Sequence, residues 1–359
     1  MATLALPTGR EEAWRWADLP ALERARTIEQ LATGIDRATM FVGLDGPRYT
    51  FIDGYLDPDW SEVGDDPLMS ASITSDHPLG LFANGQGYEL NVRSGGAVMI
   101  ELLHVAAGGE AHLPLRIVGA EDCAITLVET FVGTGWANRL TQVELGRSAR
   151  LQRAVRVLSD GGFVSTRDEV SVGQGASYVA TFLGAGNAGT RFDAQIDMVG
   201  EEAYAEMGGA LLTRDALRQE CAVRVRHAAA HGNSHQTWRA VAADKSTASL
   251  AAAVEVARHA QKTDGEQSLR GLLLQRTATV NLKPELEIFA DDVKCAHGAT
   301  VGELDRRALF YLESRGIPPA RARALLTRAF VADALDRIGD EAVRDAFAAD
   351  ADAWLEAAL

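Results

Sequence analysis

Residues 115–133, LRIVGAEDCAITLVETFVG, contain two short runs rich in β-branched residues, with the turn-forming letters GAED between them. Similar runs follow one another over about residues 70–293, as in AVMIELLHV (97–105), LTQVELG (140–146), RLQRAVRVL (150–158) and ASYVATFLGAG (176–186). Many of these runs alternate apolar and polar residues, which is the period of a half-buried strand. The pattern therefore predicts a mainly β region.

The connections between these runs limit the architecture. Few helical patterns intervene, and parallel strands in a doubly wound sheet need crossover helices, so that fold is excluded. A sandwich, a barrel or a β-helix remains. A region of about 220 residues is large for a sandwich of about 100 residues, whereas a solenoid grows by adding rungs. No strict sequence repeat is visible, and SLAAAVEVARHAQKT (249–263) fits a helix and a strand equally well.

The two ends of the chain show helical patterns. Residues 10–36 place apolar side chains at roughly helical spacing, and Pro20 is expected to split this helix; the apolar residues are Trp14, Leu19, Leu22, Ile28 and Leu31. We expect an N-terminal helical region with short strands at 1–69, a β core at 70–298 and a C-terminal helical domain at 299–359.

Helix signals in the C-terminal domain are specific. Thr300 and Glu303 have the spacing of a capping box, and Gly316 is a good residue to end the first helix. Pro318 and Pro319 are expected to begin a second helix. Residues 340–359 predict a third. The apolar face expected on the second helix consists of Ala324, Leu325, Ala329, Phe330 and Leu335.

Composition excludes several classes of function. The formal net charge is −15, which disfavours contact with nucleic acid or an anionic membrane surface. We find neither a basic leader followed by a long apolar run nor about 18 consecutive apolar residues, so we expect no signal peptide and no membrane span. Three cysteines, Cys123, Cys221 and Cys295, are far apart and odd in number, which is typical of a reducing cytoplasm rather than of a disulfide framework.

Two motifs resemble functional sites but fit turns better. HAAAHGNSH (227–235) places His227, His231 and His235 at steps of four, yet Gly232 and Asn233 would break the helix that a zinc site needs. GAGNAG (184–189) resembles a phosphate loop but lacks the lysine and the following helix. No Ser-His-Asp order or paired carboxylates stand out, so the residues make no independent case for an enzyme.

DDVKCAHGAT (291–300) places Cys295 and His297 two residues apart. A metal site normally needs about four ligands, and no further Cys or His follows. If residues 286–297 form one strand, Val293, Cys295 and His297 share a face. Taken alone, a small buried cysteine and a hydrogen-bonded histidine are favoured over ligands. Half of a site completed elsewhere is the alternative.

The segments KPELEI (283–288), ADDVKCAHGAT (290–300) and ALFYLESRGI (308–317) resemble, in this order and spacing, the C-terminal region of the SufB/SufD family, scaffold subunits of the SUF iron–sulfur cluster assembly system. REEAWRWADLPAL (10–22) and FIDGYLDPDWS (51–61) are similar to its N-terminal part. Gly298 stands where the B type has Glu, so the chain resembles the D type. Residues 249–261 depart from the family by lacking a Phe-x-Gly pattern.

This resemblance implies a right-handed parallel β-helix between helical regions, and a non-catalytic scaffold. It implies a SufB-type partner at the end of the β-helix and a SufC-type ATPase on the C-terminal helices. His297, with Cys295 beside it, would contribute to a transient, nascent iron–sulfur cluster shared with the partner chain. The ATPase-binding residues would include Leu309, Phe310, Glu313, Arg321 and Arg328, with Leu312, Leu325, Leu326 and Phe330 as further apolar anchors.

Two alternatives stay open. The chain alone could form a homodimer. Because a fold does not fix a function, a carbohydrate-active β-helix enzyme is the competing hypothesis, and it requires carboxylates clustered on one face of the solenoid.

Overall fold

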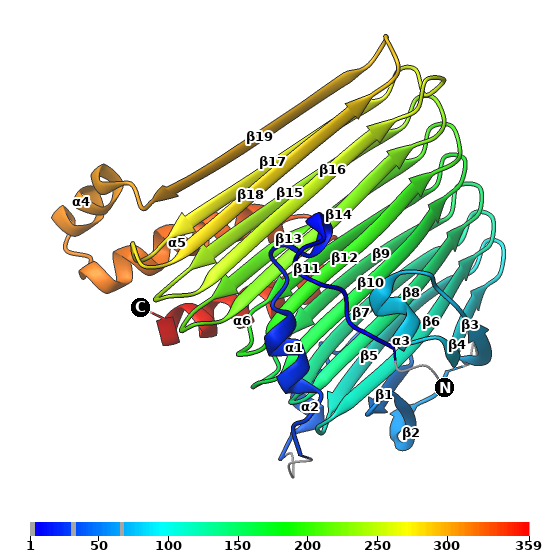
Figure 1. The fold of residues 1–359 in the computed structure, drawn as a ribbon, viewed down its shortest axis with the longest axis horizontal. Coiled ribbons are helices and arrows are strands. Elements are labelled where there is room, and N and C mark those ends of the chain that lie inside the picture. The colour runs from blue at the N-terminus through cyan, green and yellow to red at the C-terminus, as the bar shows by residue number, and fades with distance from the viewer. Residues whose placement is uncertain (1–3, 30–33, 65–67, 359) are drawn as a thin grey trace.

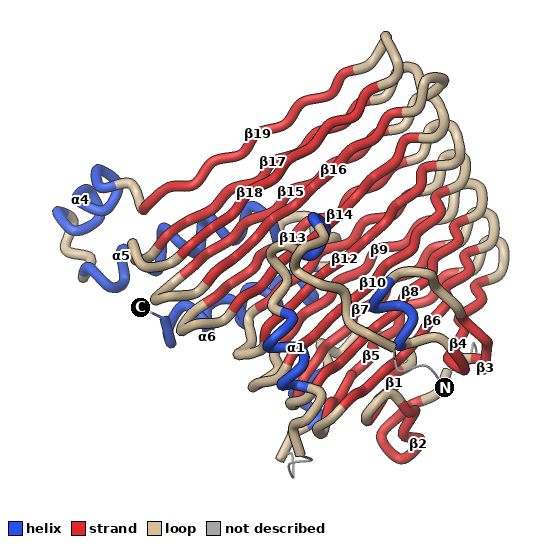
Figure 2. Tube along the Cα trace, viewed as in Figure 1, coloured by secondary structure: helices blue, strands red, loops and turns tan. Residues whose placement is uncertain are grey.

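The computed structural model of the chain describes residues 4–29, 34–64 and 68–358, and its strands lie in two stacked sheets (Figures 1 and 2). Within the described residues, sheet A has the order β19 (Lys294–Glu303), β17 (Asp264–Leu273), β15 (Asn233–Ala242), β13 (Tyr204–Thr213), β11 (Ser177–Gly184), β9 (Arg150–Val157), β7 (Ala124–Gly133), β5 (Ala97–Ala106), β1 (Arg48–Ile52), β2 (Tyr55–Glu62). Sheet B has the order β18 (Thr279–Ile288), β16 (Thr247–Val256), β14 (Arg218–His227), β12 (Gly189–Met198), β10 (Phe163–Val172), β8 (Trp136–Leu145), β6 (Glu110–Gly119), β4 (Gly85–Val92), β3 (Met69–Ile73).

From β4 onward the chain enters the two sheets in turn, and successive strands of each sheet pair in parallel. The molecule is therefore a β-solenoid of about eight turns, as the resemblance implied, and the sandwich and barrel alternatives are wrong. Of residues 249–263, which fitted a helix or a strand, residues 249–256 belong to strand β16 (Thr247–Val256).

Each coil of the solenoid turns in the same way although the sequence does not repeat. Ala97 aligns with Ala124 and Asp264 with Lys294, so a coil takes 27 residues near one end and 30 near the other. Two residues before most strands of sheet A, one residue has a positive φ, and its N–H donates to a carbonyl of the next coil. The residues at this position are Gly95, Asp122, Ser148, Gly175, Glu202, His231 and Lys262.

Alternate residues of every coil point into one continuous core between the sheets. Trp238 and Leu269 from sheet A meet Cys221 and Leu250 from sheet B there, and all four are buried. Burying such columns of apolar side chains is the dominant favourable term in folding. The opposite face of each sheet is left for other elements to cover.

Two C-terminal helices cover the outer face of sheet A. Helices α5 (Pro319–Leu335) and α6 (Glu341–Ala358) pack on outward-facing residues such as Leu183 and Leu212, whereas α4 (Arg306–Ser314) buries no side chain. These two helices therefore lie on a face of the solenoid rather than across its end. The helix starting at Pro319 and the third helix are confirmed, and Gly316 has the expected positive φ.

The predicted details of these helices need correction. Thr300 and Glu303 do not cap a helix, because β19 continues to Glu303 and Asp305 caps α4 by accepting from the Arg307 N–H. The predicted apolar face of α5 is partly wrong. Ala329 is exposed and Leu325 is 39% exposed, and the buried residues are Ala322, Thr327, Val331, Ala334 and Leu335.

The N-terminal segment lies over the outer face of sheet B. The helix expected over residues 10–36 and split at Pro20 is not formed in that way: a 3-10 turn η1 (Glu12–Trp14) precedes α1 (Leu19–Ala25), and α2 (Arg37–Met40) follows. Pro20 lies in the first turn of α1 and does not divide a helix. Trp14 and Leu22 pack with α3 (Pro78–Phe82) and with Trp136 of β8. Leu31 of the predicted pattern falls outside the described residues. Within the described residues, no helix is long and apolar enough to cross a membrane.

Candidate functional site at the open end of the solenoid

Strand β19 is the last strand of sheet A and carries both predicted ligands. Residues 286–297 do not form one strand, because β18 ends at Ile288 and β19 begins at Lys294. Cys295 and His297 nevertheless share a face, since both lie within β19. Cys295 aligns with Gly265 and His297 with Gln267, two buried residues of β17. Both predicted ligands therefore lie on the core-facing side of β19. Each is the last residue in a stack of aligned, inward-facing residues from successive coils.

The end of the solenoid at β18 and β19 is open within the described part of the chain. Nine of the ten β19 residues are exposed and only Cys295 is half-buried, in contrast to the largely buried strands in the middle of the stack. Ile288, Phe289 and Val301 are 41%, 59% and 45% exposed at this end. The opposite end differs, because β2 and β3 pair antiparallel with β1 and β4 there. Exposed strand edges with apolar side chains are templates for pairing with another chain.

Cys295 and His297 differ in their surroundings. The Cys295 sulfur packs over Gly265, where an added Cβ would lie 3.5 Å away, and burial raises the pKa of the thiol. A raised pKa disfavours the thiolate that binds metal. His297 is exposed in the middle of β19, not at its end. Of these two side chains, His297 is therefore the more accessible to a metal ion.

The described residues contain no group of three or more His, Cys, Asp or Glu side chains that could hold a metal ion. Cys123 and Cys221 are buried elsewhere, and all three cysteines are free. An iron–sulfur cluster usually takes four protein ligands. A cluster at this end would therefore need ligands from a second chain.

The histidine and glycine motifs are turns, as predicted. β14 ends at His227 and β15 begins at Asn233, so HAAAHGNSH connects the two sheets. His227 is buried, its Nε2 lies 2.8 Å from the Ser234 hydroxyl, and burial lowers its pKa to about 4. GAGNAG connects β11 to β12. Neither motif brings ligands together.

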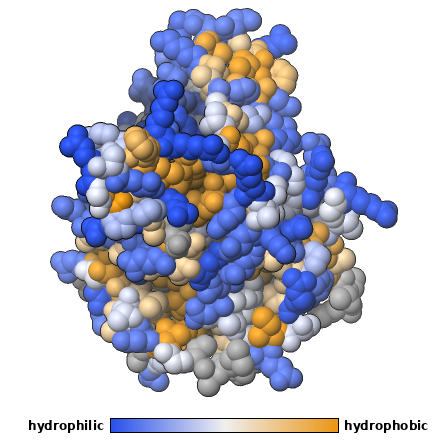
Figure 3. Space-filling model, turned by 90° about the vertical axis from the view of Figure 1, so that its left-hand side faces the viewer, coloured by the Kyte–Doolittle hydropathy of each residue, from blue (hydrophilic) through white to orange (hydrophobic). Residues whose placement is uncertain are grey.

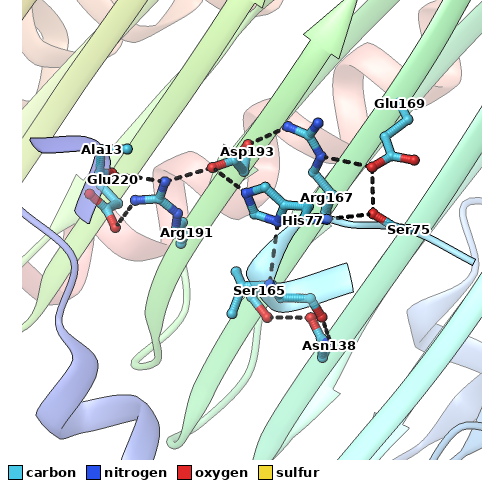
Figure 4. A network of polar contacts seen from close by, with 11 residues as sticks. Ala13, Ser75, His77, Asn138, Ser165, Arg167, Glu169, Arg191, Asp193 and Glu220 are labelled. Carbon is cyan, nitrogen blue, oxygen red and sulfur yellow. Dashed lines mark hydrogen bonds and ion pairs between the residues drawn. The ribbon is translucent and has the colours of Figure 1, made fainter. Parts of the chain in front are cut away.

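A second polar region lies on the outer face of sheet B beside the N-terminal segment, and Figure 4 shows its network of polar contacts. A cavity of about 470 Å3 opens there. Asp193 accepts from Arg167 at 2.7 Å and from Arg191 at 2.6 Å, and Arg191 also donates to Glu220 at 2.7 Å. Burial alone would raise the pKa of Asp193, but Arg191, His77 and Arg167 together lower it well below its usual range.

The buried carboxylates of Asp193 and Glu220 are paired with arginines. Neither is therefore left free to act as a general acid or base. Arg191 also donates to the Ala13 carbonyl and stacks on Trp14, with its guanidinium 3.9 Å from the ring centroid. The network therefore attaches the N-terminal segment to the solenoid.

The predicted ATPase-binding residues lie on α4 and α5. Phe310 is 73% exposed, and Glu313 and Arg321 are exposed. Tyr311, which follows Phe310 and was not among the predicted residues, is 57% exposed. Leu309 is half-buried, and Arg328 pairs with Asp352 of α6 at 2.6 Å. Figure 3 views the molecule from the side on which α4 projects in Figure 1, and apolar patches are visible there among polar side chains.

Comparison with known proteins gives the family of the chain. Residues 104–330 match the family model described as "SUF system FeS cluster assembly, SufBD core domain". The chain belongs to the SufBD family. The match spans the solenoid from the end of β5 onward, β19 with Cys295 and His297, and all of α4. SufBD membership gives the chain a role in iron–sulfur cluster assembly.

Three SufBD relatives cover most of the chain. It is 28% identical to the iron-sulfur cluster assembly protein SufD of Escherichia coli, over 94% of this chain and 87% of that protein. It is 25% identical to an iron-sulfur cluster assembly SufBD family protein of Synechocystis, over 94% and 85%. It is 26% identical to a SufBD family protein of Mycobacterium tuberculosis, over 95% and 87%.

One residue of the site was missed from the sequence. Gln267 lies directly beneath His297 in the adjacent coil, buried and inward-facing. In the sequence GEQSLRGLL (265–273), Gln267 has both polar and apolar neighbours, so no local pattern marks it. Only the strand register reveals which residue lies next to it in the adjacent coil.

Proposed function

We propose that this chain is a non-catalytic scaffold subunit for iron–sulfur cluster assembly that pairs with a SufB-type subunit through its open end. The observation that carries the proposal is the uncovered strand β19 with His297 exposed on its core-facing side. A partner strand added to β19 would continue the sheet and close His297 into the joint core. His297 would then be a ligand of the nascent cluster, and Cys295 a weaker candidate.

Sharing the ligands between two chains suits a cluster that must be released from the scaffold. A cluster held by one or two donors from each chain can be released when the two chains separate. The ATPase activity would reside in a SufC-type partner. The three free cysteines fit a reducing compartment, and we propose that the protein is cytoplasmic.

His297→Ala tests the ligand role. We expect the variant to melt as the parent chain does, because the side chain is exposed, and to pair with the partner. Cluster formation on the complex, followed by absorbance, should fall roughly tenfold or more, in the range that loss of a metal-site group produces. His235→Ala is the matched control, since His235 lies on the outer face of sheet A. Cluster formation by His297→Ala at the parental rate would show that the ligand role is wrong.

We place the ATPase contact on α4 and the adjoining face of α5. Helix α4 buries no side chain in the solenoid, and Phe310 and Tyr311 are adjacent on it and 73% and 57% exposed. Adjacent exposed apolar side chains can mark an interaction surface. Only Leu304 lies between the end of β19 and the Asp305 cap of α4. A partner that moves α4 on binding ATP would therefore act on the strand that bears His297.

The paired substitution Phe310→Ser and Tyr311→Ser should abolish retention of the ATPase in a pull-down while leaving the melting temperature unchanged. Phe289→Ser is the control, because Phe289 is exposed at the open end of the solenoid and away from α4. Further variants at Glu313, Arg321 and Arg328 map the polar edge. If all folded variants bind the ATPase with parental affinity, the ATPase binds elsewhere.

A further inference from the structure

Three aligned residues of one core column lead from the buried interior to the open end. Gln236 of β15 aligns with Gln267 of β17, and Gln267 aligns with His297 of β19. Both glutamines are buried and inward-facing, whereas His297 is exposed because no further coil of the described residues covers it. Polar side chains are unusual in a core made mainly of apolar columns, so this pair needs a physical reason.

The two glutamines are not satisfied equally. Gln236 donates from Nε2 to the Ala253 carbonyl at 3.1 Å across the core, and only its Oε1 is without a hydrogen-bond partner among the described residues. For Gln267, neither Nε2 nor Oε1 has a hydrogen-bond partner among the described residues, although the residue is only 1% exposed. An amide left unpaired in a core is strongly unfavourable, so such a group is expected to have an unassigned partner. On the open side of Gln267, the adjacent residue of the column is His297.

A histidine that binds metal has a ring N–H that needs an acceptor, so His297 can be the missing partner of Gln267. An imidazole that binds metal through one ring nitrogen usually donates the N–H of its other nitrogen to an acceptor, which fixes the tautomer and the direction of the free lone pair. Adjacent parallel strands lie about 4.8 Å apart, within reach of a glutamine amide. A neutral amide oxygen accepts this N–H without bringing a second charge into the core.

We infer that Gln267 is a positioning residue for His297: its amide oxygen accepts one imidazole N–H and leaves the other ring nitrogen free to face the partner chain. This inference rests on the proposed ligand role of His297. Gln267 itself does not touch the cluster. It selects the tautomer and orientation in which His297 presents its lone pair at the open end.

The first test needs no cluster and no partner. In the isolated full chain with 15N-labelled histidine, at a pH where imidazole is neutral, His297 should show two well-separated ring resonances, the pattern of one tautomer; these are assigned by their loss in His297→Ala. Gln267→Met, which keeps the length of the side chain but removes the acceptor, should draw the two resonances together. Gln267→Glu, which retains an acceptor oxygen, should keep them apart.

Gln236→Met is the matched control, because it is the same change in the same column one coil deeper. It should leave the His297 resonances unchanged. Separated resonances in Gln267→Met would overturn the inference. So would an equal change in Gln236→Met, since the effect would then come from general loosening of the core.

The second test uses the complex with the partner scaffold subunit and the ATPase. Cluster formation should fall roughly tenfold or more in Gln267→Met and recover at least in part in Gln267→Glu, as expected for a group that orients a ligand. If His297→Ala forms clusters normally, the proposed function fails, whatever the resonances show. If His297→Ala is impaired but Gln267→Met is not, the ligand role stands and the inference about Gln267 is wrong.

Discussion

At the scale of one residue, the burial of His227 at the end of β14 makes the free energy of unfolding depend on pH. It is fully buried, and burial lowers its pKa to about 4, against about 6.5 in an unfolded chain. Between these values the unfolded chain binds a proton that the folded chain excludes. The free energy of unfolding therefore falls as the pH decreases through this range, by about 2 kcal/mol from this residue at pH 5.

We predict that His227→Gln reduces the drop in melting temperature between pH 7.5 and pH 5, because glutamine can still bond Ser234 but does not titrate in this range. His235→Gln, at a partly exposed position, should retain the full parental drop. An unchanged drop in His227→Gln would mean that His227 does not contribute to the acid sensitivity.

At the scale of elements, buried arginines attach the C-terminal helices to sheet A. Arg156 of β9 donates to Asp350 of α6 at 2.8 Å, to Thr130 of β7 at 2.9 Å and to the Met40 carbonyl at 2.7 Å. One side chain thus joins the sheet, the last helix and the N-terminal segment. Removing it leaves a half-buried carboxylate and a buried hydroxyl without their partner.

Arg156→Met should therefore lower the free energy of unfolding by about 2–4 kcal/mol. Hydrogen exchange should quicken first in α6 and around residue 40, because these elements lose their attachment while the solenoid keeps its ladders. Arg147→Met removes an exposed ion pair with Glu121 and should change stability by less than about 1 kcal/mol. Equal effects of the two substitutions would refute this role of Arg156.

At the scale of the whole molecule, the two ends of the solenoid are finished differently. Antiparallel strands β2 and β3 end the sheets on one side, while β18 and β19 end them on the other with apolar side chains exposed. Placing Lys at Ala299 and Val301 together should keep the chain folded, since both positions are exposed. It should weaken pairing with the partner scaffold subunit about tenfold or more, because pairing would bury unpaired charges.

Light scattering after size exclusion measures this pairing, and it also shows whether the chain alone forms a homodimer through the same edge. Met69→Lys, an exposed apolar residue on the edge strand at the other end, is the control and should pair normally. Normal pairing of the doubly charged variant would place the interface away from β19.

Local sequence determined the class of structure. Alternation in residues 97–186 marked strands, because a side chain in an extended chain faces one side or the other whatever lies beyond it. Pro319 and Gly316 marked helix boundaries through their own backbone preferences. The spacing of Cys295 and His297 placed them on one face for the same reason.

Contacts between distant segments decided the rest. The turn that repeats along the solenoid is held by backbone bonds between coils, so residues as different as Asp122, Glu202 and Lys262 occupy it and no sequence repeat appears. Thr300 suggested a helix cap, but pairing of β19 with β17 extends the strand past it. The partnership of Gln267 with His297 depends on a register set 30 residues away. A sequence specifies what each residue prefers, and only the stacking of coils determines which residues meet.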